Sequence, residues 1–195
     1  MKKLAQKADR YQLYEESVQN VEFEVNFYKK MFKRTNNREA TSLREDFCAS
    51  AKISVEWVKK SSSAKSYAVD LDKKVLDYAK NISSKNLTIE QKKRLYLIYG
   101  DSIKYISPKV DIVSACNFSY WVFKTRDKLK KYFKNTHKCL NKDGLFILDA
   151  FGGYEAHQEL EERTKHKNFT YVWDQHAFNP ITNDLTCFIH FEFKD

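Results

Sequence analysis

Apolar positions along the chain follow two periods, which predict buried strands separated by helices. Short apolar runs typical of strands alternate with segments whose apolar residues recur three or four positions apart. The predicted strands are 40–47, 67–71, 95–99, 110–116 and 145–149, with helices around 53–58, 75–78 and 129–140. The run at 95–99 is typical of a strand buried on both faces. Strands joined by helical crossovers predict a doubly wound, mostly parallel sheet in a three-layer α/β/α fold.

The two ends of the chain have their own patterns. Before the first strand, one long helix is predicted by an apolar stripe at Tyr14, Val18, Val21, Val25, Tyr28 and Phe32. After residue 150, 154–165 has helical composition, and 169–174 and 185–193 predict an antiparallel strand pair. We therefore expect a single domain over 1–195, with an N-terminal helical region at 1–38, a core at 40–150, and a helix plus β-hairpin at 151–195.

Composition narrows the class of protein. The 195 residues are 42% apolar, with neither an apolar run of membrane-spanning length nor a leader-like N-terminus, so we expect a cytoplasmic protein without a membrane partner. The four cysteines are far apart, which indicates free thiols and no metal site. A net charge of +9 leaves a nucleic-acid partner open, but the lysines spread over many polar faces and favour ordinary solvated charge. The pattern specifies no oligomeric state.

Acidic residues follow the predicted strands and are the strongest candidates for chemistry. Glu45 and Asp46 end the first strand, Asp70 ends the second about twenty residues later, and Asp101 follows the third. At the carboxyl end of a parallel strand, a carboxylate can accept hydrogen bonds from a cofactor diol or an exocyclic amine. The spacing therefore predicts a nucleotide-cofactor site.

The loop after the first strand has no glycine. The chain's four glycines are Gly100, Gly144, Gly152 and Gly153, so no GxGxxG motif exists. A glycine loop lets backbone approach a ligand closely and adopt positive φ at little cost. The absence argues against an NAD-type oxidoreductase, which needs such a loop for the pyrophosphate.

Five segments together resemble the class I S-adenosylmethionine-dependent methyltransferases, in particular a branch with an R-E-D-F-C-G-T-A first motif. The segments are Arg44–Ala51, Ala68–Asp72, Tyr99–Asp101, Asn117–Trp121 and Leu140–Asp149. The resemblance covers about residues 10–195 and implies a Rossmann-like methyltransferase fold. It implies S-adenosyl-L-methionine as cofactor and methylation of an acceptor that the sequence does not name.

The resemblance also implies roles for individual residues. Glu45 to Ala51 would cradle the methionine part of the cofactor, Asp70 would bind the ribose and Asp101 the adenine amino group, while Asn117 and Phe118 would lie near the sulfonium. The implied cofactor-binding set is Glu45, Phe47, Cys48, Ala49, Asp70, Leu71, Asp101, Ser102, Asn117 and Phe118, and Tyr120 and Trp121 are candidates for stacking on the substrate. No catalytic side chain is singled out, because methyl transfer requires mainly orientation and exclusion of water.

Two departures from the family pattern leave an alternative open. Ala49 stands where the branch has glycine, and the final strands of the class I fold have no counterpart, which suggests an abbreviated C-terminal part. A catalytically silent relative that serves as a binding or regulatory module is therefore the alternative hypothesis.

Overall fold

The computed structural model describes residues 4–18 and 20–193 and divides the chain into two compact units. One unit spans residues 20–150, and the other combines the described residues up to 18 with those from 151 onward. The expected single domain stays a prediction. No helix among the described residues is long and apolar enough to cross a membrane.

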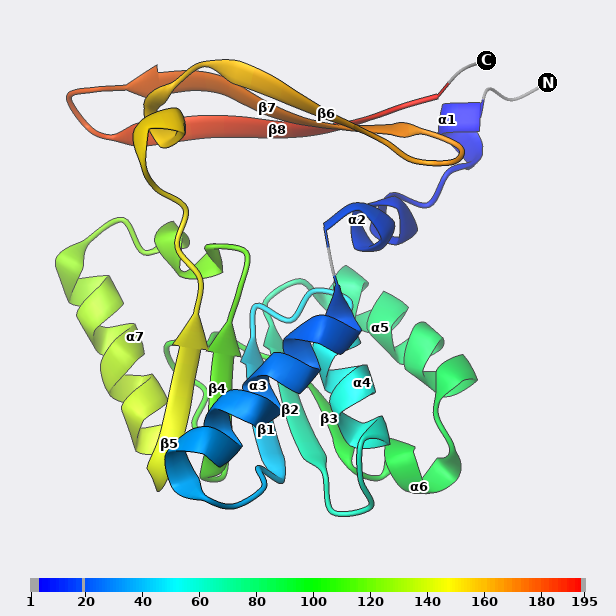
Figure 1. The fold of residues 1–195 in the computed structure, drawn as a ribbon, viewed down its shortest axis with the longest axis vertical. Helices are drawn as coiled ribbons and strands as arrows, with labels where there is room; N and C mark the ends of the chain where they lie inside the picture. Colours follow the sequence, from blue (N-terminus) through cyan, green and yellow to red (C-terminus); the bar gives the residue numbers. More distant parts are fainter. Residues whose placement is uncertain (1–3, 19, 194–195) are drawn as a thin grey trace. The chain divides into compact units, whose positions relative to one another are not determined.

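The 20–150 unit is built on a five-stranded parallel sheet, which confirms the predicted fold class (Figure 1). The strand order is β3-β2-β1-β4-β5, so the direction of winding reverses between β1 and β4. The strands are β1 (Ser42–Asp46), β2 (Lys65–Asp70), β3 (Leu95–Tyr99), β4 (Val110–Ala115) and β5 (Leu140–Leu148). In such sheets, ligands bind outside the carboxyl ends of the strands at the reversal point.

Helices cover both faces of this sheet. The helices of this unit are α3 (Val21–Asn36), α4 (Lys52–Lys59), α5 (Lys73–Asn86), α6 (Ile89–Lys92) and α7 (Arg126–Cys139). On one face, Phe32 of α3 and Trp57 of α4 pack in one buried cluster with Leu43 of β1. On the other face, Tyr132 of α7 packs with Ala115 of β4. Figure 1 shows α7 on the side of the sheet opposite α3 and α4.

The predicted long N-terminal helix is wrong, because it is divided into separate helices. α1 (Leu4–Lys7) and α2 (Arg10–Val18) belong to one unit, and α3 begins the other at Val21. Asn20 is the N-cap of α3, and its side-chain oxygen accepts a hydrogen bond from the Phe23 amide at 3.3 Å. Such a cap starts a new helix even though the apolar spacing continues across it.

β3 is an edge strand, so the expectation that it is buried on both faces is wrong. Tyr96 is 42% exposed and Tyr99 66% exposed. β5 starts earlier than predicted, at Leu140, and its pairing with β4 is irregular over residues 141–144, which lie between the predicted helix and the predicted strand. A Cβ at Gly144 would lie 2.9 Å from the Leu140 side chain, so this irregularity requires glycine.

The other unit contains a three-stranded antiparallel sheet in the order β6-β7-β8. β7 (Thr170–Asn179) and β8 (Asp184–Glu192) confirm the predicted strand pair. The helix predicted over 154–165 is wrong: only a short 3-10 turn, η2 (Tyr154–His157), forms there, and β6 (Leu160–Lys165) pairs with β7. The backbone pairing offered by β7 outweighs the helical propensity of the Leu-Glu-Glu-Arg sequence.

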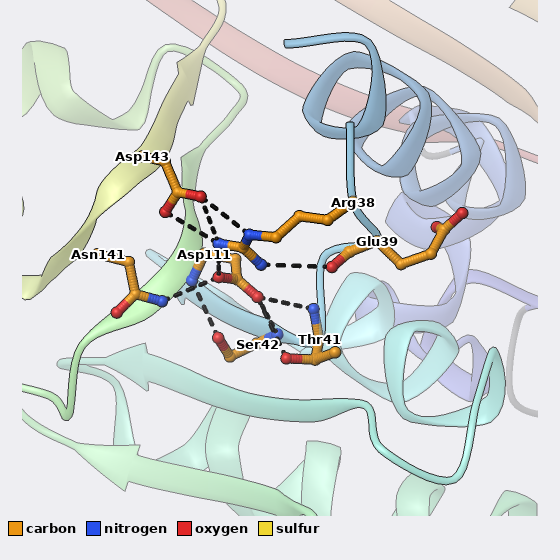
Figure 2. Close-up of polar contacts among 7 residues, drawn as sticks. All are labelled: Arg38, Glu39, Thr41, Ser42, Asp111, Asn141 and Asp143. Atoms are coloured by element: carbon orange, nitrogen blue, oxygen red, sulfur yellow. Dashed lines mark hydrogen bonds and ion pairs between the residues drawn. The ribbon is translucent and has the colours of Figure 1, made fainter. Parts of the chain in front are cut away.

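The amino ends of β1, β4 and β5 are joined by a polar network around Asp111 (Figure 2). Its carboxylate accepts hydrogen bonds from the backbone amide of Thr41 at 2.8 Å and from the Asn141 side chain at 2.9 Å. Arg38 bridges Asp111 and Asp143, with a nitrogen–oxygen distance of 2.8 Å to each carboxylate. The network lies at the sheet end opposite the candidate site.

Candidate functional site

The loop from β1 to α4 forms the centre of the candidate site. Phe47, Ala49 and Ala51 have φ values of +56°, +46° and +56°, so every second residue is left-handed. Backbone that alternates in this way forms a concave surface that can surround a ligand. The glycine-free loop thus adopts a conformation that glycine favours, at a cost of roughly 1–2 kcal/mol for each non-glycine residue.

Asp70, at the end of β2, is bonded directly to this loop. Its Oδ2 accepts a hydrogen bond from the Ala49 amide, and its Oδ1 accepts one from the Asp72 amide, both at 2.8 Å. Asp72 is the N-cap of α5, and its side chain accepts a hydrogen bond from the Lys74 amide at 2.8 Å. Each Asp70 oxygen can accept a second hydrogen bond, which leaves capacity for a ligand hydroxyl.

Glu45 lies beneath the first turn of α4 and is only 5% exposed. Its Oε2 accepts hydrogen bonds from the amide of Ser54, at 2.9 Å, and from the Ser54 hydroxyl. Burial raises the pKa of Glu45 to about 8, with nearby Glu24 and Asp70 adding to the effect, although the Ser54 hydrogen bonds act in the opposite direction. Glu45 is therefore mainly protonated at neutral pH.

Asp46 points to the other face of the sheet and has a structural environment. Its carboxylate accepts hydrogen bonds from Arg44 Nε at 2.8 Å and from the Tyr132 hydroxyl at 2.9 Å. The side chains of Arg44 and Asp46 are fully buried. The ion pair lies within β1, and the hydrogen bond from Tyr132 links Asp46 to α7.

Arg44 and Asn135 hold the irregular segment 100–109 that follows β3. Arg44 donates to the carbonyl of Tyr105 at 2.9 Å and to that of Ser102 at 3.0 Å. Asn135 of α7 donates to the same two carbonyls, both at 2.8 Å. We call this arrangement the carbonyl clamp. The sequence analysis missed it, although a lone arginine inside an otherwise buried strand was a signal.

Asp101 lies at the start of the clamped segment. Its Oδ1 accepts a hydrogen bond from the Ile103 amide at 2.9 Å, and the exposed Lys104 lies 3.8 Å from its other oxygen. Ser102, another predicted cofactor residue, is 4% exposed and contributes its carbonyl to the clamp. The clamp therefore fixes the backbone beside Asp101.

The loop after β4 contains two consecutive left-handed residues, Asn117 and Phe118, with φ values of +56° and +52°. Their amides donate to the two oxygens of Asp149, at 2.7 Å and 2.8 Å. Asp149 follows β5 and was not predicted as a site residue. It holds the backbone where the resemblance places the sulfonium.

The remaining predicted residues differ in their exposure. Cys48 is 2% exposed, and burial raises its pKa, so it packs as a small apolar residue. Leu71 is 63% exposed. Tyr120 belongs to the buried cluster beneath α7, whereas Trp121 is 44% exposed and packs against Phe118 with the two rings tilted by 45° and their centroids 6.0 Å apart. Both lie in the 3-10 turn η1 (Ser119–Val122).

α3 adds side chains to the same end of the sheet. The Tyr28 hydroxyl lies 2.8 Å from the sulfur of Cys116, which follows β4. Burial raises the pKa of Glu24, and the charge of Asp149 raises it further. Glu24 was not predicted as a site residue, because the sequence gives the same pattern for an acid on the exposed side of a helix and for one that borders a site.

Four carboxyl groups lie around the carboxyl end of the sheet, which we call the crevice because ligands bind there in sheets of this topology. Glu24 with Asp149, Glu24 with Glu45, and Glu45 with Asp70 interact electrostatically. Within residues 4–18 and 20–193, none of the four forms an ion pair with a basic side chain. The crevice is thus surrounded by acids without basic partners in a protein of net charge +9, and one of them, Glu45, is mainly protonated. The described residues contain no cluster of His, Cys, Asp and Glu able to hold a metal ion.

No protein-family model and no curated protein matches this sequence. Among solved structures, an S-adenosylmethionine-dependent methyltransferase from Clostridium acetobutylicum aligns over 94% of this chain and 79% of its own, with 20% identity and a TM-score of 0.68. A sugar N-methyltransferase from Streptoalloteichus sp aligns over 95% of this chain and 78% of its own, with 13% identity and a TM-score of 0.66. An S-adenosylmethionine-bound amino pentose methyltransferase from Micromonospora echinaspora aligns over 95% of this chain and 82% of its own, with 10% identity and a TM-score of 0.69. The chain therefore has the Rossmann-like fold found in S-adenosylmethionine-dependent methyltransferases.

Proposed function

We propose that the protein is an S-adenosylmethionine-dependent methyltransferase. The observation that carries the proposal is the β1–α4 loop, which is left-handed at three alternate positions without a single glycine and is bonded to Asp70 at 2.8 Å. A loop that retains this strained conformation has a reason beyond connecting two elements, since strain of this kind concentrates at ligand sites.

The charges of the crevice fit this cofactor. S-adenosylmethionine has a positive sulfonium and a positive amino group. The four carboxyl groups of the crevice lack basic partners among the described residues, and because Glu45 is mainly protonated, Glu24, Asp70 and Asp149 are the acids that can balance these charges. Asp70 would hold the ribose hydroxyls, and the Phe47–Ala51 backbone would surround the methionine part. The bound cofactor supplies an activated methyl group, and the protein's contribution is to orient it and exclude water.

An amine is the acceptor class that we favour. Two of the structural neighbours are named as a sugar N-methyltransferase and an amino pentose methyltransferase. An acidic crevice attracts a protonated amine and repels a phosphate or carboxylate. Purified protein with labelled S-adenosylmethionine should methylate members of an amino-sugar panel but not the matching sugars without nitrogen. Transfer to the nitrogen-free sugars alone would contradict this part of the proposal.

Calorimetric titration with S-adenosylhomocysteine tests cofactor binding itself. We expect micromolar binding by the wild type and at least tenfold weaker binding by Asp70→Ala, which loses the bond to the loop and the ribose acceptor. Asp72→Ala is the matched control, because it removes a carboxylate two residues away that caps α5. It should retain wild-type affinity.

The alternative, a catalytically silent binding module, predicts a different result. A folded wild-type protein that binds neither S-adenosylmethionine nor S-adenosylhomocysteine at millimolar concentration would refute the methyltransferase proposal. Binding that Asp70→Ala and Asp72→Ala weaken equally would instead place the ligand elsewhere.

A further inference from the structure

Helix α7 carries a concentration of positive charge that the candidate site does not use. It contains six lysine and arginine residues, and its one acid is Asp127. The charged residues are Arg126, Lys128, Lys130, Lys131, Lys134 and Lys138, all of them exposed. Helix α7 thus contributes five net positive charges to a chain of net charge +9.

These cations have no ion-pair partner within the described part of the chain. Some basic residues on other helices do have one: Lys33 lies 2.6 Å from Glu39, and Lys60 lies 2.9 Å from Glu56. The four lysines of α5, like those of α7, have no such pair among the described residues. Helix α7 differs from α5 in the number of its cations, six against one acid.

Four of the cations form one row along the helix. Arg126, Lys130, Lys134 and Lys138 are spaced four residues apart, so they lie on the same side and extend over about 18 Å. Like charges at this spacing destabilise a helix by about 0.2–0.5 kcal/mol per pair. The row contains three such pairs, and a bound polyanion would relieve their repulsion.

We infer that the exposed side of α7 is a docking surface for the phosphate backbone of a single-stranded nucleic acid. An anionic membrane fits less well, because a helix that inserts into a bilayer surface needs an exposed apolar side. The apolar side of α7 is occupied, with Tyr132 and Cys139 fully buried against the sheet. Phe133 lies beside the row and is 38% exposed. Its ring contacts Tyr120, Tyr132 and Phe146, and the exposed part can contact a base.

This surface is independent of the proposed methyltransferase activity, because its residues are distinct from the crevice carboxylates. The affinity for a fluorescently labelled 20-nucleotide RNA, measured by anisotropy at several salt concentrations, tests the inference. Each phosphate contact contributes about −0.7 to the slope of log K against log salt for a single strand. The triple variant Lys130→Gln, Lys134→Gln, Lys138→Gln should therefore reduce the slope by about 2 and weaken binding by up to ~100-fold at 0.1 M salt.

A matched control removes the same charge elsewhere. Lys74→Gln, Lys80→Gln and Lys85→Gln neutralise three exposed lysines of α5 and leave the α7 row intact. This variant should bind the RNA almost as the wild type does. Equal weakening by the two triple variants, or no binding of the wild type at 50 mM salt, would overturn the inference. Polyglutamate or anionic vesicles that bind as tightly as the RNA at equal salt would overturn the assignment to nucleic acid.

Discussion

Replacing Asp111 with asparagine should test how much the network at the amino end of the sheet stabilises the fold. The Asp111 side chain is 3% exposed. Burial acts to raise its pKa, but hydrogen bonds from Arg38, the Thr41 amide and Asn141 outweigh burial and lower the pKa to about 2 (Figure 2). Folding therefore stabilises the ionised form of the Asp111 carboxylate relative to the unfolded chain.

The size of the effect follows from the shift in pKa. A fall from 3.8 to about 2 corresponds to about 2.5 kcal/mol, at ~1.4 kcal/mol per unit. Because the folded-state pKa of Asp111 is lowered, its contribution is complete well above pH 3.8 and disappears as the pH falls through 2. Asp111→Asn should lower the free energy of unfolding by about 2.5 kcal/mol at pH 7, and the deficit should shrink to about 1.3 kcal/mol at pH 3.

Urea unfolding of both proteins at pH 7 and pH 3 provides the measurement. Asp143→Asn is the matched control, because Asp143 also pairs with Arg38 but is 41% exposed, and exposed ion pairs contribute less than about 1 kcal/mol. A deficit for Asp111→Asn that is unchanged at pH 3, or one that Asp143→Asn reproduces, would refute the reasoning. Asp111→Asn should also keep wild-type affinity for S-adenosylhomocysteine, because Asp111 lies at the other end of the sheet.

Three further changes address the candidate site. Ala49→Gly should raise the free energy of unfolding by about 0.5–1 kcal/mol, because the relief of strain at φ +46° exceeds the extra entropy that glycine loses on folding. A melting temperature no higher than that of the wild type would contradict this. The free energy of unfolding of the wild type should fall by about 3 kcal/mol between pH 5 and pH 8, because burial raises the pKa of Glu45 to about 8 and folding then disfavours the ionised form. Glu45→Gln should remove this pH dependence, which denaturant unfolding at several pH values measures. Asn135→Leu removes two donors of the carbonyl clamp and should weaken S-adenosylhomocysteine binding about tenfold. Asp111→Asn should be destabilised by a similar amount without weakening this binding. Equal affinities of the two variants in calorimetry would show that the clamp does not position the cofactor.

The sequence predicted most strands of the sheet because their apolar runs are short and end at acids or turns. It could not predict where each strand lies in the sheet, and β3 shows the consequence: an apolar run indicated burial on both faces, but the strand is at the edge. For β6, the local signal was misleading, because Leu160–Lys165 has helix-forming residues and becomes a strand only through pairing with β7. Pairing between distant segments is not encoded in a local period.

The candidate site shows the same division between local and distant information. The sequence placed Asp70 at the end of a strand, because that position depends on the end of one strand and a fixed spacing from another; its role in cofactor binding stays a prediction. It could not separate the roles of Glu45 and Asp46, which are adjacent and equally acidic. Successive side chains of a strand point to opposite faces, so the roles depend on what covers each face. Glu45 meets Ser54 of α4 and borders the crevice, while Asp46 meets Tyr132 of α7 and neutralises Arg44. The packing of distant helices therefore decides which of two neighbouring acids borders the crevice and which is held between the sheet and α7.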